Sequence, residues 1–194
     1  MHLHRPFFYV NRKKMNFIFL KENSYPKIAC EQLIDFFENN KNLSKPGGAG
    51  KNILQNLELS LTINRNDAFW GLGDTIMNGV KEYFKEYKLF HECLPEWGLD
   101  QNIQLCKFEA GKNYNFIHCE NDGNPDHMKR ILAWMLNLND IKEGGETQFI
   151  YQNFKTNPKA GNLYIWPAGA THMHKGITAP NEDKYFVSGW FVFK

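Results

Sequence analysis

Hydrophobic and polar positions follow two different periods along the chain. Apolar residues recur at helical spacing over residues 24–42, where Pro26 falls in the first turn, and again over residues 67–87. Between these two predicted helices, residues 56–63 alternate leucine or isoleucine with polar side chains, which indicates a half-buried strand. Residues 44–52 are rich in glycine, and we expect a loop there.

After Gly98 the pattern changes to short apolar runs that are separated by turn-forming residues. Eight runs predict strands, over residues 103–108, 114–120, 130–137, 147–150, 154–157, 163–167, 172–179 and 185–193. Short strands at regular spacing are typical of a β-sandwich or barrel, and such a unit cannot be divided without opening sheet edges. We therefore expect one domain over residues 15–194, with helical support over about 24–88 and an all-β core over about 103–193.

Composition and charge narrow the class of protein. Hydrophobic residues make up 42% of the chain and aromatic residues 15%, so the chain can bury a core and intrinsic disorder is excluded. The net charge of +2 gives no argument for a nucleic acid partner. Residues 1–14 carry four basic side chains and no acidic one, and we interpret them as a basic tail or extension. The apolar stretch at 17–20 is shorter than the roughly 7–15 residues of a secretory signal core and the roughly 18 of a membrane span.

The cysteine pattern indicates a reducing compartment. Cys30, Cys93, Cys106 and Cys119 form no CxxC pair, and a chain of this length does not need disulfides to stabilise its core. We expect reduced thiols, a cytoplasmic location and no membrane partner.

Two short histidine motifs are candidate metal ligands. In a strand, positions i and i+2 point to the same face about 7 Å apart, so His118 and Glu120 could share one divalent cation. His172 and His174 form a second pair of equal parity. Two histidines and one carboxylate make the facial set of non-haem Fe(II) oxygenases, which leaves coordination positions open. Asp122 is the alternative carboxylate if the strand bulges, and each pair taken alone also fits a polar surface.

Lys184 stands at the start of the last predicted strand, directly before residue 185 and ten residues after His174. A lysine that enters an apolar barrel needs an anionic partner, because a buried unpaired ammonium is very costly. A dicarboxylic cosubstrate would supply that partner. The alternative is that Lys184 marks the edge of the strand and stays in water, as most lysines do.

The order of several motifs is more specific than any one of them. His118-x-Glu120 is followed by "RILAWMLNLND" (130–140), "GGETQF" (144–149), "NPKAGNLYIWP" (157–167) and the spaced pair His174 and Lys184. With this combination the second half of the chain resembles the Fe(II)- and 2-oxoglutarate-dependent dioxygenases of the prolyl 4-hydroxylase type. The resemblance implies an α+β fold that is mainly β, with a double-stranded β-helix (jelly-roll) core of about eight strands and supporting N-terminal helices.

The resemblance also implies a ligand set. His118, Glu120 and His174 would bind Fe(II), with Glu120 in place of the usual aspartate. His174 takes this role ahead of His172 because its spacing to Lys184 matches the family. Lys184 would pair with the distal carboxylate of 2-oxoglutarate.

Two positions depart from the family pattern. Phe108 and Asn137 stand where tyrosines are common, so we expect a rebuilt cosubstrate pocket in which Asn137 and Tyr114 supply hydrogen bonds. Arg130 and Trp190 fall at positions that the family uses on the substrate side, although Trp190 also fits a core role.

The implied activity is hydroxylation of an aliphatic C–H with Fe(II), 2-oxoglutarate and O2, and with ascorbate as an optional reductant. A peptidyl proline or another protein side chain is the expected substrate, and a small metabolite or a nucleobase is the alternative. Without residues 1–14 the chain has a net charge of −2, which disfavours nucleic acid. A non-catalytic cupin-like barrel is less favoured, because no glutamate follows the "HMH" motif closely. The sequence leaves the oligomeric state open.

Overall fold

The large sheet of the fold is built around the last strand, β11 (Lys184–Phe193). The computed structural model describes residues 16–47, 54–60 and 71–194. Within them, antiparallel strands form this sheet in the order β1-β9-β6-β11-β5-β3-β2, and β4 also pairs with β11. The other strands of this sheet are β1 (Phe19–Lys21), β2 (Lys45–Gly47), β3 (Leu54–Ser60), β4 (Trp97–Leu99), β5 (Asn102–Phe108), β6 (Arg130–Asn137) and β9 (Leu163–Pro167).

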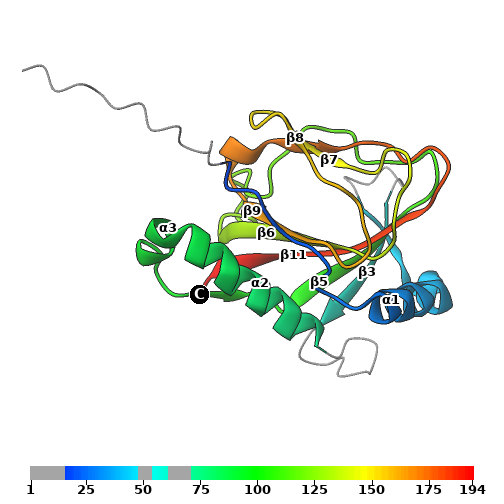
Figure 1. Ribbon diagram of the computed structural model, residues 1–194, viewed down its shortest axis with the longest axis horizontal. Helices are drawn as coiled ribbons and strands as arrows, with labels where there is room; N and C mark the ends of the chain where they lie inside the picture. The colour runs from blue at the N-terminus through cyan, green and yellow to red at the C-terminus, as the bar shows by residue number, and fades with distance from the viewer. Residues whose placement is uncertain (1–15, 48–53, 61–70) are drawn as a thin grey trace, which may run out of the picture.

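A smaller antiparallel sheet completes the β-core. Its strands follow the order β10-β7-β8, with β10 at His174–Gly176, β7 at Thr147–Phe149 and β8 at Phe154–Lys155. Figure 1 shows β7 and β8 on one side of the large sheet and the helices on the other. The predicted architecture, mainly β with a jelly-roll core and N-terminal helices, is confirmed.

Helices α1 (Lys27–Asn40) and α2 (Leu72–Glu86) pack on the outer face of the large sheet (Figure 1). In α1 the buried side chains are Cys30, Leu33 and Phe37, which form one helical stripe. The helix begins after Pro26, whose backbone is extended. Two short segments follow the helices, a 3₁₀ turn at Lys41–Leu43 and α3 at Lys88–Glu92. No helix among the described residues is long and apolar enough to span a membrane.

The large sheet separates two hydrophobic clusters because its side chains alternate between its faces. On β6, Trp134 and Leu136 join the large cluster against the helices. Ala133 points the other way and joins a small cluster with Phe149 of β7 and Trp166 of β9. The small cluster therefore lies between the two sheets, which is where the candidate site is found.

The predicted strand over 114–120 is wrong. This segment is a loop, and among the described residues its one β-bridge joins His118 to His174 of β10. The consecutive residues Phe116 and Ile117 are 44% and 53% exposed. The segment therefore lacks the alternating buried face that holds a strand in a sheet.

Other predicted bounds shift at the ends of elements. The predicted strand 172–179 is reduced to β10, because Ala170–His172 forms a 3₁₀ turn. The predicted loop 44–52 contains β2, and its residues 48–52 lie outside the described part of the chain. Predicted residues 61–63 of the first strand and 67–70 of the second helix also lie outside it. The short elements β1, β4 and α3 were not predicted.

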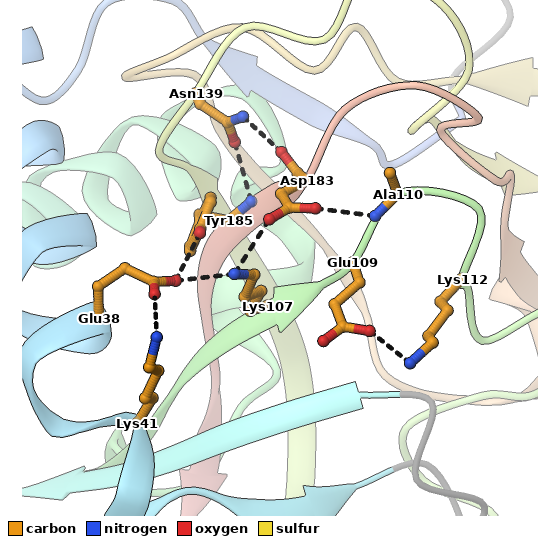
Figure 2. Close-up of polar contacts among 9 residues, drawn as sticks. All are labelled: Glu38, Lys41, Lys107, Glu109, Ala110, Lys112, Asn139, Asp183 and Tyr185. Carbon is orange, nitrogen blue, oxygen red and sulfur yellow. Dashed lines mark hydrogen bonds and ion pairs between the residues drawn. The ribbon is translucent and has the colours of Figure 1, made fainter.

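A network of polar side chains ties α1 to the ends of β5 and β11 (Figure 2). The Lys107 ammonium lies 2.8 Å from Glu38 Oε1 and 3.0 Å from Asp183 Oδ2. The Tyr185 hydroxyl donates a hydrogen bond of 2.6 Å to the same Glu38 oxygen. Hydrogen bonds from Lys107 and Tyr185 lower the pKa of Glu38 to about 2. Because Asp183 and Tyr185 flank Lys184, the network fixes the backbone on both sides of that residue.

We predict that Glu38→Gln lowers the free energy of unfolding by about 1–2 kcal/mol at pH 7, because charged hydrogen bonds are lost at a partly exposed site. The folded-state pKa of Glu38 is depressed, so its contribution is fully present above pH 4.5 and is lost as the pH falls toward about 2. Urea unfolding of both proteins at pH 7 and at about pH 3 checks this. A difference of equal size at the two pH values would contradict it.

Candidate metal centre

The site begins with a backbone contact between two histidines that are far apart in the sequence. The N–H of His118 donates to the carbonyl of His174 at 2.9 Å, and the N–H of His174 donates to the carbonyl of His118 at 2.8 Å. Two residues that exchange both hydrogen bonds in this way project their side chains from the same face. The two imidazole centroids are accordingly 4.4 Å apart.

Glu120 reaches the same place from the loop that carries His118. The N–H groups of Glu120 and Asn121 both donate to the carbonyl of Ala168, at 3.0 and 2.9 Å. Glu120 Oε1 lies 3.4 Å from His174 Nε2 and 3.7 Å from His118 Nε2. One possible ligand atom from each of the three residues lies within 4.8 Å of the others.

Backbone carbonyls set the tautomer of both histidines. His118 Nδ1 lies 2.8 Å from the carbonyl of Phe116, and His174 Nδ1 lies 2.8 Å from the carbonyl of His172. A carbonyl oxygen only accepts hydrogen bonds, so each Nδ1 carries a proton. The Nε2 atom of each imidazole therefore faces Glu120, where it donates a hydrogen bond to the carboxylate when it carries a proton and offers a lone pair to a metal when it does not. This orientation, with the second nitrogen bonded to a backbone carbonyl, is usual for metal-binding histidines.

The electrostatics favour an ionised carboxylate in this cluster. Burial by itself raises the pKa of Glu120, but hydrogen bonds and charge from His118 and His174 outweigh it and hold the pKa well below its usual range. Burial likewise lowers the pKa of His118, and its contacts with Glu120 and the Phe116 carbonyl more than compensate, so that pKa is raised. Glu120 is therefore an anion at neutral pH.

Lys184 is buried between the two sheets and is 6% exposed. Its ammonium donates a hydrogen bond of 2.7 Å to the carbonyl of Gly145 and lies 4.0 Å from the sulfur of Met135. No carboxylate of the described residues lies within ion-pair distance of it, although Glu146 attracts it from further away. Burial lowers its pKa to about 8. A buried ammonium with these contacts calls for an anionic ligand.

The glycine pair of the "GGETQF" motif allows the loop to approach Lys184. Gly144 and Gly145 have φ angles of +71° and +73°, which side-chain-bearing residues rarely adopt. A Cβ on Gly144 would collide with the carbonyl of Thr178. The N–H of Gly145 donates to the carbonyl of Ile177 at 3.0 Å, which turns the Gly145 carbonyl toward the ammonium.

A cavity of about 190 Å³ joins these groups. Glu120, His174 and Lys184 all line it. Phe108 and Phe186 form part of its apolar wall, with ring centroids 5.6 Å apart. Its volume is below the roughly 300–1,000 Å³ of sites for drug-sized molecules, so it suits a small metabolite.

The donors fit an Fe(II) site. Two imidazole Nε2 atoms and one ionised carboxylate converge from one side, which is the facial arrangement that leaves coordination positions open. The ammonium in the same cavity fits the far end of a dicarboxylate cosubstrate.

Residues 103–192 match the family model described as the 2OG-Fe(II) oxygenase superfamily, where 2OG is 2-oxoglutarate. They form a 2OG-Fe(II) oxygenase domain. The matched residues include all three residues of the cluster and Lys184. The predicted resemblance to this class is thereby confirmed.

A curated relative and several solved structures are prolyl hydroxylases. Probable prolyl 4-hydroxylase 9 of Arabidopsis thaliana is 21% identical over 132 residues, which cover 55% of this chain and 46% of the plant protein. The chain thus spans about half the length of that relative.

Similarity to solved structures extends over most of this chain. The viral collagen prolyl hydroxylase of Paramecium bursaria Chlorella virus-1, in complex with 2-oxoglutarate, has a TM-score of 0.69 at 16% identity, covering 92% of this chain and 96% of that one. A Pseudomonas putida prolyl-4-hydroxylase has a TM-score of 0.68 at 15% identity, with coverage of 91% and 92%. A Trichoplax adhaerens prolyl hydroxylase, in complex with a hypoxia-inducible factor peptide fragment, has a TM-score of 0.66 at 13% identity, with coverage of 94% and 86%. At these identities the similarity shows the shared fold.

Of the two residues expected to complete the oxygenase cosubstrate pocket, the structure places one at the cavity. Tyr114 lines the cavity, and its ring lies edge-on to His118 with centroids 4.8 Å apart. Asn137 is buried but is not among the cavity-lining residues, and its amide donates to the carbonyl of Asn162. Asn137 lies at the end of β6, and its predicted role in cosubstrate binding stays a prediction.

The structure places Arg130 and Trp190 against Glu120 of the cluster. The Trp190 indole N–H donates a hydrogen bond of 2.9 Å to Glu120 Oε2. The Arg130 guanidinium stacks on the Trp190 ring, 3.6 Å from its centroid, and donates to the backbone carbonyl of Glu120 at 3.1 Å. Their predicted place on the substrate side stays a prediction.

The alternative ligands from the sequence lie apart from the cluster. His172 Nε2 lies 2.9 Å from the carbonyl of Asn16, and its Nδ1 lies 3.0 Å from the Thr171 hydroxyl. Asp122 is exposed, and its carboxylate contacts His127 at 3.0 Å.

Several polar residues of the oxygenase cavity were missed by sequence reasoning. They are Gln104, Asn113, Thr147 and Ser188. Parity would have found Ser188, because it shares a strand face with Lys184, and Gln104 is its partner across the sheet. Thr147 belongs to the "GGETQF" motif, and its place in that motif is the signal that could have indicated a position at the site.

We predict that His174→Ala abolishes Mn(II) binding, with Mn(II) as a redox-stable probe of the Fe(II) site, whereas His172→Ala leaves most of it. Of these two histidines, only His174 offers Nε2 to Glu120. His172 contributes a backbone carbonyl, which the substitution retains. Calorimetric titration of the purified proteins measures both effects. The reverse order of effects would move the second ligand to His172.

Proposed function

We propose that this protein is an Fe(II)- and 2-oxoglutarate-dependent oxygenase that hydroxylates an aliphatic C–H, in a peptidyl proline or another protein side chain. The observation that carries the proposal is one cavity that joins a two-histidine, one-carboxylate cluster to a buried ammonium, for which the described residues supply no carboxylate at ion-pair distance. The 2OG-Fe(II) oxygenase domain over residues 103–192 supports both cofactors.

In this proposal His118, His174 and Glu120 hold Fe(II) through the two Nε2 atoms and Oε1. The chemistry supplied by bound Fe(II), 2-oxoglutarate and O2 is insertion of one oxygen atom into a substrate C–H, while the other enters succinate as carbon dioxide is released. The presence of a carboxylate ligand favours hydroxylation over halogenation, for which this superfamily replaces that ligand.

Lys184 has the task of binding and orienting the cosubstrate. Its ammonium would pair with the distal carboxylate, and the Gly145 carbonyl already fixes its direction. The apolar wall formed by Phe108, Phe186 and Met135 limits water in the cavity, which strengthens a charge pair there. Phe108 contributes only apolar surface, where a tyrosine would contribute a hydroxyl. Lys184 therefore accounts for a larger part of the affinity for the cosubstrate.

A protein or peptide substrate is supported by the surface beside the cluster. The His118 side chain is 31% exposed, and the apolar residues Phe116 and Ile117 precede it on an exposed loop. Exposed apolar side chains next to an open cluster suit an apolar peptide side chain. The Trichoplax adhaerens prolyl hydroxylase, which has a similar fold, is seen with a peptide fragment.

The proposal predicts turnover of proline-containing peptides. Protein supplied with Fe(II), 2-oxoglutarate and air should release succinate and yield a peptide that is one oxygen atom heavier by mass spectrometry. Without air, the same mixture should show the weak visible absorption of Fe(II) chelated by a 2-oxo acid, and His174→Ala should show neither signal. Folded protein that lacks this absorption at saturating Fe(II) and 2-oxoglutarate would count against an oxygenase of any substrate.

We further predict that Lys184→Ala weakens 2-oxoglutarate binding by about two to three orders of magnitude. Removing one partner of a desolvated ion pair costs roughly 3–5 kcal/mol, and each 1.4 kcal/mol is about tenfold in affinity. Lys184→Arg should recover part of the loss, because a guanidinium can still meet a carboxylate. Titration of 2-oxoglutarate into Mn(II)-loaded proteins measures this, and Mn(II) affinity itself should not change. Unchanged 2-oxoglutarate affinity in Lys184→Ala would assign the distal carboxylate to another group.

A further inference from the structure

The two carboxylate oxygens of Glu120 have different partners. Oε1 faces the histidines, at 3.4 Å from His174 Nε2 and 3.7 Å from His118 Nε2. Oε2 accepts the hydrogen bond of 2.9 Å from Trp190 Nε1 and lies 3.8 Å from the guanidinium of Arg130. One oxygen is thus directed toward the metal position, and the other is held away from it.

Arg130 supports this arrangement through three contacts. It stacks on the Trp190 ring at 3.6 Å, donates to the backbone carbonyl of Glu120 at 3.1 Å and places positive charge near Oε2. The stacking restrains the indole plane, and the backbone hydrogen bond restrains the loop that carries Glu120. The side chains of Arg130 and Glu120 are each 18% exposed, so solvent screens these contacts only weakly.

We propose that Trp190 and Arg130 are positioning residues that hold Glu120 so that only Oε1 is offered to the metal. The inference rests on the proposed function. A glutamate has one more rotatable side-chain bond than an aspartate, so a metal-binding glutamate loses more conformational freedom and can swing to bind through both oxygens. Binding through both oxygens would occupy a coordination position that the cosubstrate or O2 needs. The indole N–H prevents this by engaging Oε2.

Trp190→Phe tests the contact, and Trp134→Phe is its matched control. Both substitutions remove an indole N–H from a tryptophan of the large sheet that lines the cavity, but Trp134 Nε1 has no hydrogen-bond partner among the described residues, whereas Trp190 Nε1 donates to Glu120. Loss of an outer contact to a metal ligand costs about 10–100-fold in metal affinity. Mn(II) titration should show such a loss for Trp190→Phe and none for Trp134→Phe.

Arg130→Met is the second variant, which keeps an apolar stem over the indole and removes the charge and its donors. It should also weaken Mn(II) binding, and it decides the question if Trp190→Phe does not fold by circular dichroism. Mn(II) affinity within about twofold of the unaltered protein in the folded variants would overturn the inference, since about tenfold or more is expected. A loss confined to peptide binding would instead place both residues on the substrate side.

A double-mutant cycle with Glu120→Asp separates positioning from general damage. An aspartate carboxylate is one methylene shorter and does not reach the indole N–H while it binds the metal. Trp190→Phe should therefore have little further effect on Mn(II) affinity in the Glu120→Asp background, so the two effects should not add. Simple additivity would overturn the inference.

The coordination of Co(II) gives a readout that a merely structural role would not change. If Glu120 is released to bind through both oxygens, Trp190→Phe should show weaker visible absorption from Co(II) than the unaltered protein, because the intensity falls as the coordination number rises. An unchanged Co(II) spectrum would contradict the inference. If the unaltered protein binds neither Mn(II) nor Co(II), the proposed function and the inference are both overturned. If the unaltered protein and Trp190→Phe both bind these ions normally, only the inference is overturned.

Discussion

The two backbone hydrogen bonds between His118 and His174 are the contact on which the site depends. They join a loop to the edge of a three-stranded sheet, and they bring the two imidazoles to the same side. β10 is in turn held by β7, where His174 pairs with Phe149. Gly176 contributes by having no side chain, because a Cβ there would collide with the amide of Asn113 in the incoming loop. The position of the loop therefore follows from the small sheet.

Strand β11 connects this interior to the helical layer through the alternation of its side chains. Lys184 points into the cavity, and its neighbour Tyr185 points outward and donates to Glu38 of α1. Lys107 joins Glu38 to Asp183 just before the strand begins (Figure 2). The Lys184 ammonium is buried away from water, so the backbone that carries it has to hold it in a position where it meets a polar partner. Helix α1 thereby supports the Lys184 side of the cavity without lining it.

The sequence predicted those features that depend on local periodicity. β6 and β9 have the predicted bounds, because their apolar runs are continuous and end at turn-forming residues. The segment around His118 is a loop rather than a strand, yet His118 and Glu120 still converge, because their backbone N–H groups are held by the carbonyls of His174 and Ala168. Strands as short as β1 show too few positions for a period to be visible.

The remaining features depend on contacts that sequence spacing does not contain. The hydrogen bond between Trp190 and Glu120 requires a glutamate long enough to offer one oxygen on each side, and an indole oriented by the stacked Arg130. The position of Asn137 likewise depends on the neighbouring turn, whose Asn162 carbonyl accepts its amide.

The glutamate at position 120 shows how a longer side chain can keep the geometry of a facial site. The extra methylene lets the carboxylate of a glutamate reach more positions than that of an aspartate. Without restraint it could bind through both oxygens and occupy a coordination position that the site needs to keep open. The surrounding structure removes that freedom at both ends of the residue. The Ala168 carbonyl and Arg130 hold the backbone, while Trp190 holds the outer oxygen. The longer side chain of Glu120 is therefore restrained by its surroundings, and the cavity between the sheets keeps room for a cosubstrate beside it.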